Sequence, residues 1–148
     1  MARLRLTQEA DYALRIVWIL AKADETLDAK KVSELACVPE RFTVKILRKL
    51  VLRGTVASKK GAMGGYLLAA DPRELTMRQV IETIDGPLEI SRCLNDGYRC
   101  LRNFDKKCCT FHLIFEKVNK EMAEKFDRIT IADAIDDEIG IDVILGKI

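Results

Sequence analysis

Residues 31–53 read KVSELACVPERFTVKILRKLVLR, and residues 54–68 continue as GTVASKKGAMGGYLL. The first stretch holds two short apolar patterns on either side of residues 37–39, whose proline is tolerated where a helix begins. In the second pattern, apolar residues recur at the spacings of three and four that an amphipathic helix requires: Phe42, Ile46, Leu47, Leu50 and Val51. Gly54 is typical of the residue after a helix end. Two short helices around a tight turn predict a helix-turn-helix, in which Cys37 is expected to be a packing residue.

The residues after Gly54 predict a β-hairpin. Residues 55–58 and 66–68 are short strand-like segments, and the loop between them is basic and rich in turn-forming glycine. A hairpin in this position is a wing, whose lysines can reach a phosphate or the minor groove of DNA. We expect Tyr66 to pack at the base of the wing.

The net charge of +2 conceals an uneven distribution of charge. Residues 31–60 contain eight Lys or Arg against two acidic residues, whereas residues 74–148 carry an acidic surplus. A basic segment within a helix-turn-helix indicates binding to double-stranded DNA. We expect Arg41 and Lys45 to read base edges. We expect phosphates to be held by Arg48, Lys59 and Lys60.

A helix is also predicted over residues 8–22, with Thr7 as its N-cap. Apolar residues surround its second half, which indicates a central position or a subunit interface. The sequence therefore predicts a mainly α fold with a small β-hairpin wing. We expect one compact unit per chain, with a winged helix-turn-helix DNA-binding domain over 1–73 and a sensing and dimerising region over 74–148.

Four of the five cysteines lie in the second region, in the pattern C-x6-C-x7-C-C-x2-H formed by Cys93, Cys100, Cys108, Cys109 and His112. The polar residues around them indicate an exposed loop. Because paired C-x2-C knuckles are missing, structural zinc is disfavoured, and soft thiolates on a loop favour an iron–sulfur cluster. His112 follows Cys109 by one helical turn, so it is either a further ligand or an ordinary surface histidine.

The cysteines are followed by a helix predicted from Thr110 to Arg128. Its apolar stripe indicates either core or a dimer seam: Phe111, Phe115, Val118, Met122 and Phe126. We favour the seam, because a helix-turn-helix gains affinity by pairing two half-sites. The expected assembly is a homodimer with a long dimerisation helix.

Several classes of protein are disfavoured. No apolar run approaches the ~20 residues of a membrane helix, and no signal-peptide pattern is present, so we expect a cytoplasmic protein without a membrane partner. No nucleophile–base pair, carboxylate dyad or phosphate loop is recognisable. We therefore expect neither an enzyme nor a small-molecule substrate.

These segments together resemble the Rrf2 family of bacterial winged-helix regulators, which includes the cluster-sensing repressors IscR, NsrR and RirA. The resemblance covers nearly the whole chain. It rests on Leu6-Thr7 with residues 11–15 (DYALR), on residues 32–36 (VSELA), on residues 46–50 (ILRKL), on the wing sequence GAMGGYLL over 61–68, and on the cysteine loop before a long helix.

The resemblance implies the ligands of an iron–sulfur cluster. Cys93 and Cys100 match the first two family cysteines, and Cys109 matches the third, with the adjacent Cys108 as its alternative. His112 matches the C-x2-H of IscR-like members as the fourth ligand. Asp11 is the alternative fourth ligand, supplied by the partner subunit. A two-iron cluster is favoured, with a four-iron cluster as the alternative.

The expected function is that of a DNA-binding transcriptional regulator that acts as a repressor. Its operator affinity would be controlled by a cluster that senses iron–sulfur status, redox state or nitric oxide. A cluster-free thiol-switch regulator is the alternative, followed by a zinc-stabilised DNA-binding protein.

Overall fold

Helix α1 (Gln8–Ala23) lies at the centre of the fold, in a computed structural model that describes residues 6–102 and 105–148. The Thr7 hydroxyl caps it by accepting a hydrogen bond from the Ala10 amide at 3.1 Å. Helices α2, α3, α4 and α6 all pack against α1, as does the wing. Its predicted central position is confirmed, and the physical reason is its wide apolar surface.

The helix-turn-helix consists of α2 (Ala29–Ala36) and α3 (Glu40–Leu52). Helix α3 ends in a Schellman motif, because the amides of Gly54 and Thr55 donate to the carbonyls of Val51 and Leu50 at 3.0 Å. The prediction for Cys37 is wrong: its side chain is exposed. Cys37 ends α2 in the left-handed conformation, with φ of 52°, and this conformation satisfies the helix end without burying the thiol.

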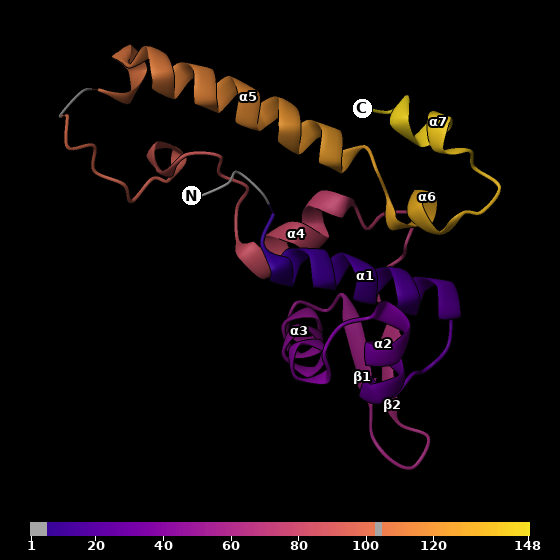
Figure 1. The fold of residues 1–148 in the computed structure, drawn as a ribbon. Coiled ribbons are helices and arrows are strands. Elements are labelled where there is room, and N and C mark those ends of the chain that lie inside the picture. The colour runs from indigo at the N-terminus through magenta and orange to yellow at the C-terminus, as the bar shows by residue number, and fades with distance from the viewer. Residues whose placement is uncertain (1–5, 103–104) are drawn as a thin grey trace.

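The wing is an antiparallel hairpin of β1 (Val56–Lys59) and β2 (Gly65–Leu68), in which Val56 pairs with Leu68. It projects from the body at the end opposite α5 (Figure 1). At its base, Tyr66 and Leu27 exchange two backbone hydrogen bonds of 2.7 and 2.9 Å, and the Tyr66 ring packs against the core. The wing is thereby fixed to the connection between α1 and α2.

Helix α4 (Met77–Asp85) connects the two predicted regions. Thr76 and Gln79 form a capping box at its start, and Gly86 ends it. Val80 and Ile84 belong to the same core cluster as Ile16 and Leu47. The core therefore includes residues from both sides of position 73.

The remaining chain begins with an irregular stretch that contains two single 3-10 turns, η1 (Arg92–Leu94) and η2 (Lys106–Cys108). It continues with α5 (Thr110–Asp127), α6 (Ile131–Ile135) and α7 (Ile141–Leu145). Helix α6 is held on α1, since the Trp18 indole donates to the Ala134 carbonyl at 2.9 Å. The predicted mainly helical fold with a two-stranded wing is confirmed.

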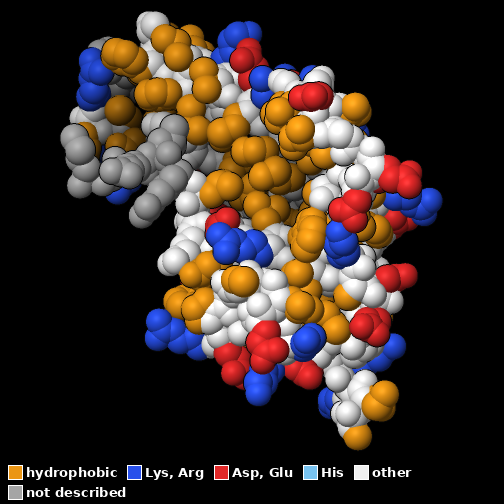
Figure 2. Space-filling view, turned by 45° about the vertical axis from the view of Figure 1, so that its right-hand side comes forward, with side chains coloured by type: hydrophobic (Ala, Val, Ile, Leu, Met, Phe, Trp, Pro, Cys, Tyr) orange, Lys and Arg blue, Asp and Glu red, His pale blue; other side chains and the backbone are white. Residues whose placement is uncertain are grey.

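Helix α5 runs across the top of the molecule, away from the helix-turn-helix (Figure 1). Its His112 and Ala123 are buried, whereas four large apolar side chains remain between 46% and 63% exposed: Phe111, Leu113, Ile114 and Val118. Apolar side chains gather over the upper half of the face drawn in Figure 2. No helix in the described part of the chain is both long and apolar enough to cross a membrane.

Candidate metal centre and nucleic-acid interface

A cavity of about 350 Å³ lies where the cysteine loop meets the start of α5. Its lining includes Cys93, Cys100, Cys109 and His112. Cys93 comes from η1, Cys109 is the residue that caps α5, and His112 lies in the first turn of that helix. The fold therefore brings together three thiols and one imidazole that are spread over 20 positions of sequence.

His112 is a buried histidine with an unsatisfied nitrogen. The residue is 9% exposed, and its Nδ1 has no hydrogen-bond partner among the described residues. Leaving a buried polar atom unpaired costs about 1–3 kcal/mol, so such an atom needs an explanation. Imidazole nitrogens are common ligands of transition metals, and His112 shares the lining of its cavity with three cysteines.

The local sequence explains how the thiols are presented. The Ser91 hydroxyl lies 3.3 Å from Cys93 Sγ, within hydrogen-bond distance for sulfur. Asp105 caps η2 by accepting a hydrogen bond from the Lys107 amide at 3.0 Å, which shapes the chain just before Cys109. Cys109 then lies at the N-terminus of α5, where the helix dipole favours negative charge such as that of a thiolate.

The two alternative ligands lie elsewhere. Cys108 is exposed and does not line the cavity. Asp11 lies on α1, where its carboxylate pairs with Arg15 at 2.8 Å, and it does not line the cavity of its own chain.

The four candidate ligands line a cavity and are not gathered around a single point. Among residues 6–102 and 105–148, no three Cys, His, Asp or Glu side chains converge closely enough to hold a single metal ion. Cys93, Cys100, Cys109 and His112 thus share the lining of one cavity without forming a compact metal-binding group.

Three of the predicted DNA-binding residues lie on one exposed face of α3, and the other two lie on the wing. Arg41, Lys45 and Arg48 are all exposed and follow one another at spacings of four and three. The Arg41 guanidinium lies over the Phe42 ring, 4.8 Å from its centroid. Lys59 and Lys60 are exposed at the end of β1 and the start of the wing loop.

The sequence analysis did not single out Leu52. It lies four residues after Arg48, on the same face of α3 as Arg41 and Lys45, and is 85% exposed. The helical spacing from Arg48 was the available signal. An apolar side chain in this position can contact a sugar or a thymine methyl group.

Sequence reasoning also missed Glu9, in the first turn of α1. One of its carboxylate oxygens accepts from Lys45 Nζ at 2.5 Å, and the other accepts from Lys49 Nζ at 2.9 Å. The hydrogen bonds from these lysines hold the pKa of Glu9 below its usual value. No local pattern could reveal this contact, because 36 residues separate Glu9 from Lys45.

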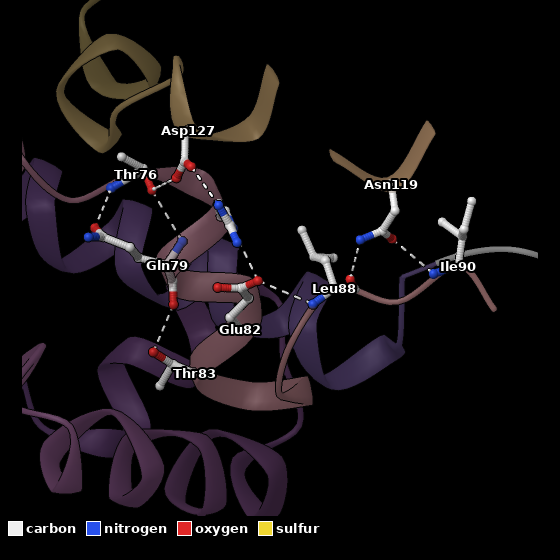
Figure 3. A network of polar contacts seen from close by, with 9 residues as sticks. Thr76, Gln79, Glu82, Thr83, Leu88, Ile90, Asn119 and Asp127 are labelled. Atoms are coloured by element: carbon white, nitrogen blue, oxygen red, sulfur yellow. Dashed lines mark hydrogen bonds and ion pairs between the residues drawn. The ribbon is translucent and has the colours of Figure 1, made fainter. Parts of the chain in front are cut away.

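A polar network joins α5 and the segment over 88–90, which precedes the cysteine loop, to α4 (Figure 3). The Asn119 amide of α5 binds the backbone at Leu88 and Ile90, and the Leu88 amide donates to Glu82 of α4 at 3.2 Å. Arg78 of α4 contacts both Glu82 and Asp127, the last residue of α5. The segment just before Cys93 is therefore tied to both helices.

A helix-turn-helix with a wing and a basic exposed recognition face defines a transcriptional regulator that binds DNA. The family model for "Iron-dependent Transcriptional regulator" proteins matches residues 6–137. The chain belongs to this family, the Rrf2 family, whose members are regulators and not enzymes.

Individual relatives agree with this assignment. An rrf2-like relative from Rhodobacter capsulatus is 29% identical over 137 residues, covering 88% of this chain and 91% of that one. The solved structure of T. potens IscR has a TM-score of 0.70 and 25% identity, and covers 89% of this chain and 86% of that one. The structure of CymR, the global cysteine regulator of B. subtilis, has a TM-score of 0.72 at 21% identity and covers 90% of this chain and 97% of that one; this similarity supports the fold alone.

Proposed function

We propose that this chain is a cytoplasmic, homodimeric transcriptional regulator whose DNA affinity is controlled by an iron–sulfur cluster. The ligands in this proposal are Cys93, Cys100, Cys109 and His112. Two observations carry it: the four residues line one cavity, and the buried His112 Nδ1 has no hydrogen-bond partner in the described chain. The family description, which names iron dependence, supports the same conclusion.

The donor set has the chemistry of an iron–sulfur site. Thiolates are the usual ligands of such clusters, and an imidazole in place of a thiolate changes the reduction potential. When bound, the group supplies a centre that responds to oxidants and nitric oxide. Arg99 and Lys106 line the same cavity, and their positive charge offsets that of three thiolates. With three thiolates and one imidazole, a two-iron cluster is preferred to a four-iron cluster.

The network of Figure 3 supports a route from the cluster site to the DNA-binding face. Binding of a cluster by Cys93 and its fellow ligands would fix the segment at Leu88, which contacts both Asn119 of α5 and Glu82 of α4. Helix α4 packs on α1 and α3, so a shift of α4 moves the recognition helix. Regulation of this kind requires an element with two states, and in this proposal they are the loop with the cluster bound and the loop without it.

The exposed apolar side chains of α5 support a second copy of the chain as the partner. A two-fold dimer would place two recognition helices on two half-sites of an operator. In such a dimer, Asp11 of one subunit could reach the cysteine site of its partner. Asp11 therefore stays the alternative to His112 as the fourth ligand.

Purification without oxygen tests the proposal. We expect a brown protein with charge-transfer absorption and with iron and sulfide in equal amounts. Cys109→Ser should lose the cluster, while the adjacent Cys108→Ser should retain it, and this pair controls for the general effect of losing a thiol. His112→Ala should change the spectrum and Asp11→Ala should not. A colourless protein that binds zinc and no iron would overturn the proposal.

One observation favours a thiol switch as the second candidate. Cys108 is exposed beside Cys109, so an oxidant can reach it directly. This mechanism predicts that peroxide changes DNA affinity in iron-free protein and that a thiol reductant reverses the change. The cluster mechanism predicts no such change without iron.

A further inference from the structure

Glu9 bridges two lysines of the recognition helix. Its Oε1 accepts from Lys45 and its Oε2 from Lys49, so each oxygen serves a different ammonium group. The Glu9 side chain is only 26% exposed, against 55% for Lys45. A carboxylate from α1 thus lies against the positively charged side of α3.

This contact reduces the positive charge that the recognition helix presents to DNA. Lys45 stands between Arg41 and Arg48 on the exposed face of α3, where a phosphate or base edge is expected. In the free protein, the charge of the Glu9 carboxylate offsets that of Lys45 and so lowers the positive potential of this face. Each lysine withheld from DNA removes one phosphate neutralisation and its release of counterions.

We propose that Glu9 is a positioning residue that withholds Lys45 from DNA, so that the wild type binds a duplex of random sequence without a Lys45 phosphate contact and gains this contact only where the carboxylate is displaced. The proposal rests on DNA binding, which family membership supports, and is independent of the cluster.

The two lysines differ in how firmly they are held. Lys49 Nζ also donates to the Ile84 carbonyl at the end of α4, at 3.4 Å, and its side chain is only 36% exposed. In the described part of the chain, Lys45 has Glu9 as its only hydrogen-bonding or ion-pairing partner. Lys45 is therefore the lysine that exchanges, and Lys49 is the one that keeps Glu9 and α4 attached to α3.

The end of α4 strengthens this junction. The Thr7 hydroxyl, two residues before Glu9, donates to the Asp85 carboxylate at 2.6 Å. The start of α1, the end of α4 and the side of α3 therefore meet at one place. Glu9 remains anchored through Lys49 when Lys45 leaves, so release of Lys45 does not require the helices to separate.

The test measures the affinity for a fluorescein-labelled duplex of random sequence over about 0.05–0.3 M potassium chloride, since the electrostatic contribution is independent of sequence. Glu9→Gln should bind roughly three- to tenfold more tightly at low salt. Its plot of log affinity against log salt should be steeper by about 0.9, the value for one added phosphate contact. Glu25→Gln removes the same charge beyond the other end of α1 and should leave both quantities near those of the wild type.

A double-mutant cycle assigns the effect to Lys45. Adding Lys45→Met to Glu9→Gln should abolish the gain, whereas adding Lys49→Met should not. Thermal unfolding of each variant verifies that it folds. An unchanged slope in Glu9→Gln would overturn the proposal, and weaker binding would show that Glu9 instead holds Lys45 ready for DNA. If the wild type bound no DNA at any salt concentration, the DNA-binding face itself would be wrong, a result distinct from an unchanged slope.

Discussion

Asn119, near the middle of α5, holds the backbone of Leu88 five residues before Cys93. Its Nδ2 donates to the Leu88 carbonyl at 2.7 Å, while its Oδ1 accepts from the Ile90 amide at 3.0 Å. One side-chain amide thus satisfies a donor and an acceptor of an irregular segment that has no secondary structure of its own (Figure 3). Asn119 therefore connects the long helix to the segment just before the cysteine loop through two hydrogen bonds.

Asn119→Leu should loosen the cysteine loop without altering the DNA-binding face. The change leaves two partly buried backbone groups unpaired, which costs about 1–3 kcal/mol of unfolding free energy. We expect the iron content per chain to fall by roughly half or more, and urea denaturation to report the loss of stability. Lys125→Leu places the same side chain at an exposed position of α5 and should retain its iron. Full iron loading of Asn119→Leu would contradict this role.

The wing lysines provide a second prediction. The double variant Lys59→Ala, Lys60→Ala should bind DNA more weakly at every sequence, because phosphate contacts do not distinguish bases. The slope of log affinity against log salt should become shallower by up to about 1.8, the value for two lost phosphate contacts. The matched control is the double variant Lys117→Ala, Lys120→Ala on α5, which removes two cations far from the wing. Equal salt slopes for the two double variants would place the wing outside the DNA interface.

The helix-turn-helix and wing were predictable because their signals are local. The apolar spacing within α3, Gly54 after its end and the glycines between β1 and β2 each act over a few residues. The predicted boundaries therefore differ from the structure by one residue in most cases. Cys37 is the exception, since sequence pattern does not reveal that this turn residue adopts a left-handed conformation with its thiol exposed.

The candidate sites were predictable in part. The residue types and the family resemblance indicated the ligands and favoured Cys109 as the third, with the adjacent Cys108 as its alternative. Their positions differ physically because Cys109 caps α5 at the cavity, while Cys108 ends the preceding turn and is exposed. The Glu9–Lys45 contact depends on how α1 crosses α3, and such tertiary geometry has no signature in local sequence.

Gly65 is a position where only glycine fits. Its φ is +152°, and a Cβ atom added there would lie 2.4 Å from the Leu27 carbonyl oxygen. Gly65→Ala should therefore push β2 away from Leu27 and break the backbone bonds of Tyr66, with a loss of more than about 1 kcal/mol of stability and weaker DNA binding. Gly140→Ala is the control, since a Cβ there meets nothing within 4 Å. Equal unfolding midpoints for the two variants would refute the steric argument.

The C-terminal tail is fastened by an ion pair that titrates. Lys147 Nζ lies 2.7 Å from Asp133 Oδ1, and the Asp133 side chain is only 12% exposed. Burial by itself raises the pKa of Asp133, but hydrogen bonds from Lys147 and Thr130 outweigh burial and lower the pKa below its usual value of 3.8. A carboxyl group whose pKa is lowered on folding stabilises the protein at pH values above its unfolded pKa. That stability is lost as the pH falls through the folded pKa.

Lys147→Met should consequently destabilise the protein in a pH-dependent way. At pH 7 the Asp133 carboxylate is charged, and loss of its partner should cost roughly 1 kcal/mol, a value reduced by the partial exposure of Lys147. As the pH falls below 3.8, protonation of Asp133 removes the ion pair from the wild type as well, so the two stabilities should converge. Chemical denaturation at several pH values between about 3 and 7 measures this difference, with the exposed Lys125→Met as the control. A difference that stayed constant over this range would show that Lys147 acts through packing of its aliphatic chain and not through its charge.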